Sequence, residues 1–182
     1  MSVVIRPERA DDLEFIAYVQ RLAFGRDDEA RLVDALRAGG FVRVSLVAEQ
    51  DKQVIGHILF SDLPIITQDG TVAALALAPL AVLPACQRQG IGSALVRRGL
   101  ELCKEQDHCI VVVLGHPNFY QRFEFSSKLA AQLESPYSGR ESYMAVELAA
   151  GALDGVRGRA QYPPAFEQPP QIRQACNDDQ AE

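Results

Sequence analysis

The amino-acid sequence predicts an α/β fold with a mixed, mostly antiparallel sheet, one parallel pair of strands at its centre and flanking helices. Two patterns in the 182 residues carry this prediction. Residues 42–60 alternate apolar and polar side chains around a short turn, which is typical of an antiparallel hairpin. Further on, a strand, a helix over about 91–106 and an apolar run over 109–114 follow one another. This is the order of a βαβ unit, whose strands lie parallel with a right-handed crossover.

The first forty residues predict a short strand and two helices. The strand covers residues 3–5 and ends before Pro7. Asp11 is placed to cap the first helix, with Glu14 reaching back to it. This helix buries a mostly apolar stripe at helical spacing, namely Leu13, Ile16, Ala17 and Gln20. The second helix opens with acidic residues at 27–29, which favour the positive end of the helix dipole, and it stops at two glycines.

The rest of the predicted sheet contains one proline that interrupts regular pairing. We expect a third long strand over Val72–Leu83, in which Pro79 has no N–H to donate, so the strand must bulge or leave its neighbour there. Gly99 in the following helix costs about 1 kcal/mol relative to alanine, which predicts close packing against the sheet. A short helix over Pro117–Phe123 and a last strand over 143–148 complete the pattern.

The length and the distribution of prolines predict one domain with an extension. Residues 1–150 contain all the predicted strands and helices. Four of the ten prolines fall within residues 163–182, and the last nine residues carry three acidic residues and no basic one. We therefore expect residues 151–182 to form a proline-rich C-terminal extension that is extended or partly disordered.

Composition excludes several classes of protein. Apolar residues make up 48% and charged residues 23%, as in an ordinary globular chain, so global disorder is excluded. A net charge of −6 disfavours a nucleic-acid partner. The longest apolar stretch contains two prolines and is too short for a membrane helix, and no signal peptide is apparent. We expect no metal site and a cytoplasmic location, because the scattered thiols lack metal-ligand spacing: Cys86, Cys103, Cys109 and Cys176.

The segment over residues 80–95 carries the strongest chemical signal. It is a strand, a glycine-containing turn and a helix start, so successive backbone N–H groups converge on one spot near the positive end of a helix dipole. Arg88 adds a full charge, and residues 85–105 hold four basic side chains against two acidic ones. Gly90 and Gly92 either shape a tight turn only or admit a pyrophosphate. A third glycine at dinucleotide-fingerprint spacing and a P-loop lysine are both lacking.

Two motifs resemble the GNAT superfamily of N-acetyltransferases. Gln87-Arg88-Gln89-Gly90-Ile91-Gly92 matches that family's Q/R-x-x-G-x-G/A motif and follows a strand that ends Leu80-Ala81-Val82. The stretch from His116 to Phe125 is similar to the family's Y-x-x-x-G-F region after the fifth strand. The order of elements follows the family core over residues 3–148, and the closest likeness is to a poorly characterised bacterial branch.

The resemblance implies a GNAT acyl-CoA N-acyltransferase fold that binds acetyl-CoA as co-substrate between two splayed parallel strands. Freed backbone groups of Ala81 and Val82 would pair with the pantetheine amides, and an N–H near Val82 would stabilise the oxyanion. Backbone N–H groups from Arg88 to Ser93 would take the pyrophosphate. The implied cofactor-binding residues are Leu80, Ala81, Val82, Arg88, Gln89, Gly90, Ile91, Gly92, Ser93 and Asn118.

Tyr120 is the catalytic residue that the resemblance implies. Its hydroxyl would donate a proton or hydrogen bond to the departing CoA thiolate. The alternative is a buried aromatic residue among three neighbouring phenylalanines. Glu124 stands where the family usually has glycine, so the turn after Tyr120 is expected to differ and to shift this side chain.

The general base and two neighbouring groups have open assignments. His116 is suited to the role directly or through water, although capping of the short helix is the favoured reading. Glu49 and Asp62 are further candidates, each also explained as a solvated strand end. Cys86 before the turn is read as a spectator rather than a nucleophile. The pair Arg97-Arg98 either meets the 3′-phosphate of CoA or lies on a solvated helix face.

The resemblance therefore predicts an enzyme that moves an acetyl group from acetyl-CoA to a primary amine by direct attack in a ternary complex. The amine belongs to a small molecule or to a protein, and a homodimer is an open alternative to a monomer. A second hypothesis is an acetyl-CoA-binding regulatory module with weak or no catalysis, motivated by Glu124 and by the missing base.

Overall fold

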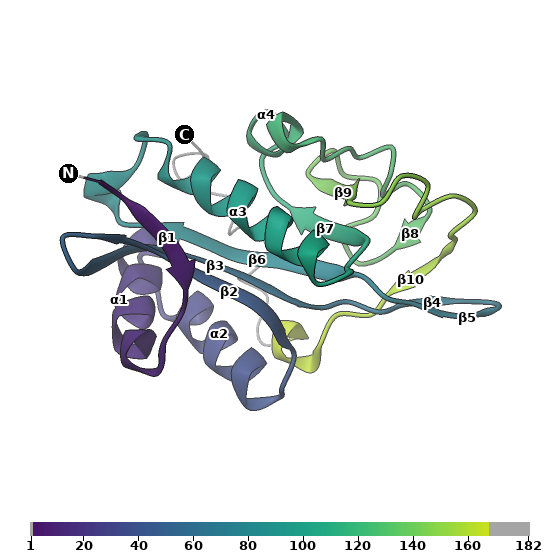
Figure 1. The fold of residues 1–182 in the computed structure, drawn as a ribbon. Helices are drawn as coiled ribbons and strands as arrows, with labels where there is room; N and C mark the ends of the chain where they lie inside the picture. Colours follow the sequence, from purple (N-terminus) through teal and green to yellow (C-terminus); the bar gives the residue numbers. More distant parts are fainter. Residues whose placement is uncertain (1, 168–182) are drawn as a thin grey trace.

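The computed structural model describes residues 2–167, which form a six-stranded sheet with helices on both faces and a smaller sheet at one end (Figure 1). The main sheet has the strand order β1-β2-β3-β6-β7-β9, and the second has the order β5-β4-β10-β8. The elements in chain order are β1 (Val4–Pro7), η1 (Ala10–Asp12), α1 (Leu13–Phe24), α2 (Asp28–Ala38), β2 (Val42–Gln50), β3 (Gln53–Asp62), β4 (Ile65–Thr67), β5 (Gly70–Val72), β6 (Leu75–Val82), η2 (Pro84–Cys86), α3 (Ile91–Glu105), β7 (Ile110–Leu114), α4 (Pro117–Tyr120), η3 (Gln121–Phe123), β8 (Leu133–Glu134), β9 (Tyr143–Glu147), β10 (Gly158–Ala160) and η4 (Pro164–Glu167).

The central parallel pair of strands is confirmed. Strand β6 pairs parallel with β7 through Leu75–Leu77, while every other neighbouring pair in the main sheet is antiparallel. The β2–β3 hairpin predicted from alternation is also present, with Val44 opposite Phe60 and Ala48 opposite Gly56. The fold is therefore the mixed, mostly antiparallel α/β arrangement that the sequence predicts.

Pairing between β6 and β7 stops after Leu77, as expected from Pro79. Strand β6 continues for five more residues along β3, whereas β7 ends one residue later at Leu114. Opposite Leu59 the β3–β6 register shifts, because two residues of β6 occupy the place of one. The predicted bulge and the predicted departure thus occur together, and the two central strands diverge at this point.

One expected strand is wrong in its extent. The predicted strand Val72–Leu83 is two strands in different sheets: β5 pairs with β4, and β6 pairs with β3 and β7. Between them Leu63 N–H donates to the carbonyl of Ala74 (N···O 2.8 Å). Val72, Ala74 and Ala76 all pack in one apolar cluster, so the residue types do not mark the place where the chain changes sheets.

Helix α3 covers one face of the main sheet, and α1 and α2 cover the other (Figure 1). Gly99 lies against the ring of Phe60, since a Cβ built on it would be 2.4 Å from Phe60 Cε2. This confirms the close helix–sheet packing predicted for that glycine. Cys103 and Leu95 on the same helix are fully buried in the cluster above the sheet.

The start of the first helix differs from the prediction in its capping residue. A turn of η1 precedes α1, and Asp12 rather than Asp11 occupies the position before the helix. The Asp12 carboxylate accepts the Arg9 N–H (2.7 Å) and binds the Arg6 guanidinium (Nη1···Oδ2 2.6 Å). The Asp12 side chain thus binds Arg6 and Arg9 and makes no capping hydrogen bond to α1, so the predicted cap by Asp11 is wrong.

Residues 151–167 of the expected C-terminal extension are folded against the rest of the domain. Strand β10 pairs with β4 on one side and β8 on the other, and η4 lies beside α2 (Figure 1). Phe166 packs against two apolar clusters, one under α1 and α2 and one at the second sheet. Aromatic side chains between the prolines thus fold this segment onto the domain. The rest of the predicted extension, 168–182, lies outside the described residues.

Candidate active site

At the diverging end of β6, backbone groups of alternate residues face the gap left by β7. Hydrogen-bonding groups of successive strand residues point to alternate sides. The Leu83 N–H donates to the Ile55 carbonyl in β3 (2.9 Å), so Ala81 also directs its N–H and carbonyl towards β3. Leu80 and Val82 direct theirs to the other side. The backbone groups that face the gap therefore belong to Leu80 and Val82. Those of Ala81, which were also predicted to be free, point to β3 instead.

The turn that follows β6 has the geometry of an anion site. Arg88 and Gly90 both adopt left-handed backbone conformations (φ 60° and 80°), and α3 begins directly afterwards at Ile91. The first N–H groups of a helix have no acceptor within it, so those of Ile91, Gly92 and Ser93 face the turn. Gln87 Nε2 donates to the Val82 carbonyl (3.0 Å), which fastens the turn to the strand end. Arg88, Gln89 and Gly90 are exposed beside it.

Tyr120 lies at the carboxyl end of β7, next to the point where the strands diverge. Its ring lies against the backbone of Gly115, where a Cβ would approach Tyr120 Cε2 to 2.1 Å. Edge contacts with Phe119 and Phe125 hold the ring (centroid distances 4.9 and 5.6 Å), and 8% of the residue is exposed. The predicted aromatic cluster and the predicted position near the splay are thus both present. Asn118 is exposed on α4, two residues before Tyr120.

The turn after Tyr120 is formed despite the missing glycine. Glu124 has a φ of 68°, which is the left-handed conformation that glycine would supply, and its N–H donates to the Gln121 carbonyl (3.1 Å). Phe125 then returns to the core beside Tyr120. The expected shift of this segment is therefore not required, although a non-glycine residue in this conformation is strained by roughly 1–2 kcal/mol.

The candidate bases differ in their surroundings. Glu49 binds Arg6 (Nε···Oε2 2.8 Å) and Asp62 binds Arg43 (Nε···Oδ1 2.9 Å), so each carboxylate already has a cation as partner. His116 is half-buried between the end of β7 and α4. Its backbone carbonyl accepts the N–H groups of Phe119 and Tyr120 (both 3.1 Å), whereas its side chain makes no capping hydrogen bond.

Three other candidates are placed by their contacts. Cys86 is half-buried in η2 and packs against the core, as expected of a spectator. Arg98 binds Glu101 and Glu105 (Nη1···O 3.1 and 3.0 Å) along the outer face of α3. Arg97 instead lies over the ring of Phe123 (5.4 Å from Cζ to the centroid). Adjacent residues therefore have different partners, which spacing along a helix does not predict.

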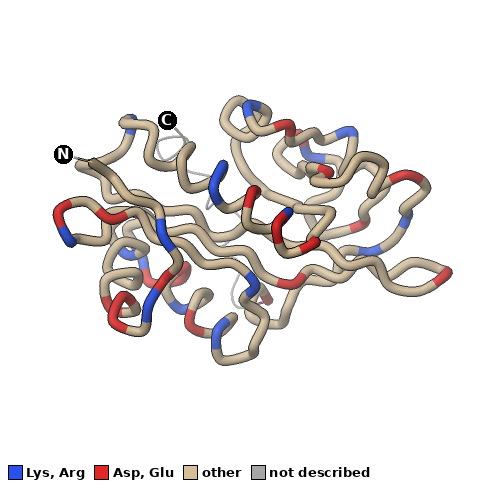
Figure 2. Tube along the Cα trace, in the orientation of Figure 1, with Lys and Arg blue, Asp and Glu red and all other residues tan. Residues whose placement is uncertain are grey.

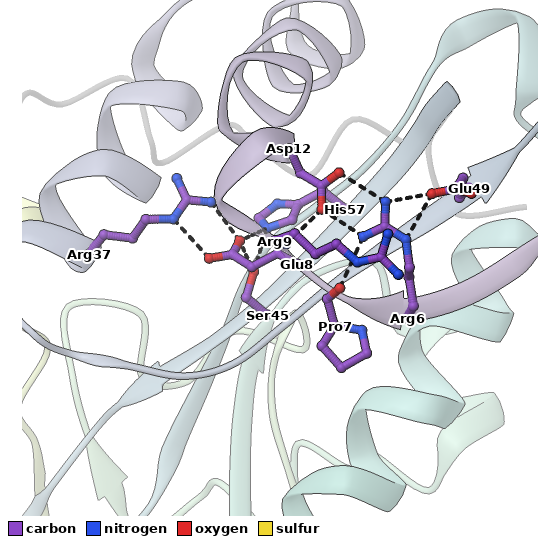
Figure 3. A network of polar contacts seen from close by, with 9 residues as sticks. All are labelled: Arg6, Pro7, Glu8, Arg9, Asp12, Arg37, Ser45, Glu49 and His57. Carbon is purple, nitrogen blue, oxygen red and sulfur yellow. Dashed lines mark hydrogen bonds and ion pairs between the residues drawn. The ribbon is translucent and has the colours of Figure 1, made fainter. Parts of the chain in front are cut away.

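A buried polar network under the sheet was not predicted from the sequence (Figure 3). His57 on β3 is fully buried opposite Ala81 of β6. Its Nδ1 lies 2.9 Å from Gln20 Nε2 on α1, and its Nε2 lies 2.9 Å from Ser45 Oγ on β2. The Ser45 hydroxyl donates to Glu8, which also binds Arg37 on α2 (Nη2···Oε2 2.7 Å). The signals that pointed to it were Gln20 in an apolar stripe and His57 in an apolar strand.

Burial and hydrogen bonding set the charges in this network. Burial lowers the pKa of His57, and the nearby Glu8 offsets only part of this effect. Burial raises the pKa of Glu8, but hydrogen bonds from His57, Arg37 and Ser45 outweigh it and hold that pKa well below its usual range. A neutral His57 that accepts from Gln20 through Nδ1 donates from Nε2 to Ser45 Oγ. One neutral ring and one ion pair thus join β2, β3, α1, α2 and the segment that follows β1.

Comparison with known proteins defines the class. The family model described as Acetyltransferase (GNAT) family matches residues 11–125, and the chain belongs to this family of acetyltransferases. Among curated relatives, the uncharacterized N-acetyltransferase YhbS of Escherichia coli K12 is 38% identical over 162 residues, covering 88% of this chain and 96% of YhbS. The uncharacterized N-acetyltransferase YjhQ of the same strain is 36% identical over 116 residues, covering 63% and 64%.

Two solved structures show the same fold with ligands. E. coli YhbS in complex with CoA has a TM-score of 0.84 and 36% identity, covering 91% of this chain and 92% of its own. A GNAT acetyltransferase of Brucella melitensis in complex with acetyl-CoA has a TM-score of 0.76 and 33% identity, covering 91% and 99%. Within residues 2–167, no helix is long and apolar enough to span a bilayer, and no cluster of metal-ligating side chains is found.

Proposed function

We propose that this chain transfers the acetyl group of acetyl-CoA to a primary amine by direct attack in a ternary complex. The observation that carries the proposal is the end of β6, where Leu80 and Val82 face the gap left by β7 and lead directly into the anion-binding turn. Strand-like backbone groups next to a helix N-terminus suit a chain of amides that ends in a pyrophosphate. The complexes of the two relatives with CoA and acetyl-CoA support the same reading.

Each part of the site has a role in this reaction. Leu80 binds the pantetheine amides through its backbone, and backbone N–H groups from Arg88 to Ser93 bind the pyrophosphate. Asn118 at the start of α4 contacts the cofactor from the other side of the gap. The Val82 N–H stabilises the oxyanion that develops on the thioester carbonyl. Three cysteines of the described chain are free thiols, which supports a cytoplasmic location.

Proton transfers fall to two residues near the end of β7. As the amine nitrogen bonds to the acetyl carbon and the C–S bond breaks, Tyr120 gives a proton or hydrogen bond to the thiolate. His116 accepts the proton of the amine, directly or through water, because an imidazole nitrogen placed beside the acceptor can act as a general base. Glu49 and Asp62 are less suited because each is held in an ion pair.

The test combines binding with turnover. Calorimetry with acetyl-CoA measures binding, and thiol release with a panel of polyamines, amino acids and lysine peptides measures transfer. Tyr120→Phe is expected to lower kcat at least about 100-fold with acetyl-CoA affinity kept. Tyr18→Phe is the matched control, because Tyr18 is 54% exposed on α1 and is expected to change neither quantity.

The outcomes separate the proposal from its alternative. Unchanged turnover in Tyr120→Phe would remove the catalytic role of that residue. Binding without thiol release across the panel would favour the acetyl-CoA-binding regulatory module. The formed turn at Glu124 weakens the original reason for that alternative, because the segment that carries Tyr120 is in place.

A further inference from the structure

Two arginines from different elements converge on the ring of Phe123. Arg97 on α3 places its Cζ 5.4 Å from the ring centroid, and Arg122 on η3 places its Cζ 6.0 Å from the same centroid. Arg122 also lies 4.7 Å from the centroid of Phe119, and its Nε donates to the Phe119 carbonyl (3.3 Å). Figure 2 shows basic residues on α3 and on the α4–η3 segment, which lie on the same side of the main sheet.

Contact with an aromatic ring prepares a guanidinium to bind an anion. The face of the cation rests on the ring, while its N–H donors radiate in the guanidinium plane. Phe123 is itself buried, so it forms a fixed platform for both cations. Within the described part of the chain, no carboxylate lies within ion-pair distance of Arg97. Its neighbour Arg98 differs, because two glutamates already compensate its charge.

The position of this pair relative to the turn identifies the anion. Arg97 lies six residues after the first residue of α3, which is about 9 Å along the helix axis. The backbone N–H groups at that helix start are those assigned above to a pyrophosphate. In CoA one ribose separates the pyrophosphate from the 3′-phosphate, a dianionic group that dephospho-CoA lacks. A second phosphate site beside the first therefore matches the chemistry of CoA.

We propose that Arg97 and Arg122 bind the 3′-phosphate of CoA and make this enzyme select acetyl-CoA over acetyl-dephospho-CoA. The inference rests on the proposed function, since it assumes that the turn at residues 88–93 holds the pyrophosphate. It goes further by assigning two side chains and a preference between two ligands. Both arginines are exposed, so their replacement removes charge without opening the core.

Titration calorimetry with CoA and dephospho-CoA tests the inference. The wild type is expected to bind CoA at least about tenfold more tightly, because charge-assisted hydrogen bonds to a phosphate are strong. Arg97→Gln and Arg122→Gln are each expected to weaken CoA several-fold and to leave dephospho-CoA unchanged. Arg98→Gln is the matched control and is expected to alter neither affinity. Arg97→Lys is expected to recover part of the preference.

The two ligands separate failure of this inference from failure of the proposed function. Equal binding of CoA and dephospho-CoA by the wild type would remove the inference alone. So would an Arg97→Gln variant that weakens both ligands equally. If neither ligand binds, the proposed function falls and the inference falls with it. Near-ultraviolet circular dichroism of each variant checks that Phe119, Tyr120 and Phe123 keep their packing.

Discussion

Glu124 holds a backbone conformation that only glycine adopts without strain. Its φ of 68° closes the turn after η3 and returns the chain to the core at Phe125. A side chain in this conformation costs roughly 1–2 kcal/mol. The position of Tyr120 is thus kept at the expense of stability, and substitution can recover part of that stability.

Glu124→Gly is expected to stabilise the protein by about 0.5–1 kcal/mol. Relief of the strained conformation exceeds the extra entropy that glycine gives to the unfolded chain. Urea denaturation measures the change. Lys128→Gly is the control, because Lys128 is exposed and has no positive φ, so glycine there is expected to destabilise. A loss of stability in Glu124→Gly as large as in the control would contradict this account of the turn.

Single residues also show what local pattern can and cannot predict. Gly99 and Pro79 were interpreted correctly because each has a backbone property that acts at its own position in the chain. Arg97 and Arg98 were given the same two alternative roles, because adjacent positions on a helix look alike until their partners are known. The other polar residues of the His57 network come from α1, β2, α2 and the segment that follows β1, so no spacing in the sequence brings them together.

At the scale of elements, the network around His57 links α1 and α2 to β2, β3 and the segment that follows β1 (Figure 3). It lies directly under Ala81, between the two residues that face the splay. Buried polar groups of this kind favour one arrangement of the elements over others rather than adding much stability. The network therefore positions β2 and β3 against α1 and α2.

The stability of the protein is expected to fall as pH is lowered from about 7 to 5. His57 has a lowered pKa in the folded state and the usual value near 6.5 when unfolded, so the unfolded state binds a proton that the folded state does not. The loss approaches about 1.4 kcal/mol per pH unit below 6.5. Glu8, whose pKa is lowered, is ionised in both states above its usual value and adds no slope until the pH falls further.

Urea denaturation between pH 8 and 5 measures this dependence. His57→Gln keeps an amide in the network and is expected to flatten the profile, while His108→Gln, outside the network, is expected to leave the wild-type slope. Identical profiles for all three proteins would show that another group carries the acid sensitivity.

Boundaries between elements were predictable where a local signal marks them. Helix α3 begins at the glycine turn, and α4 begins at Pro117, both as expected. The break between β5 and β6 carries no such signal, because Ala73 and Ala74 continue an apolar run. Its place is determined by pairing with β4, which is a contact of tertiary structure.

At the scale of the whole molecule, the segment after β9 belongs to the folded domain. Its prolines suggested an extension, yet Tyr162 and Phe166 contact one another (centroids 5.1 Å apart), and Phe166 packs against two clusters. Composition alone does not reveal that this segment is folded, because the four prolines dominate its composition and only two aromatic side chains indicate packing. Their burial decides where the chain lies.

Phe166→Ala is expected to destabilise the protein by about 2 kcal/mol. A half-buried ring loses less than the full cost of a core phenylalanine but opens the seam between the clusters. Phe15→Ala on α1 is the control, since Phe15 is 57% exposed and surface substitutions stay within about 0.5 kcal/mol. Thermal unfolding of both variants gives the comparison. If both variants lose equally little stability, the packing of Phe166 does not stabilise the domain, and this account of residues 161–167 is wrong.

The central place of β10 in the second sheet has a consequence for biosynthesis. Strand β10 separates β4, made early, from β8, made later, and it pairs with both. While the chain emerges from the ribosome, the main sheet can close once β9 has appeared. The β4–β5 hairpin must wait about ninety residues for its second neighbour, with one edge open to other chains. A chaperone that covers this edge until β10 is made is therefore expected to raise the yield of native protein.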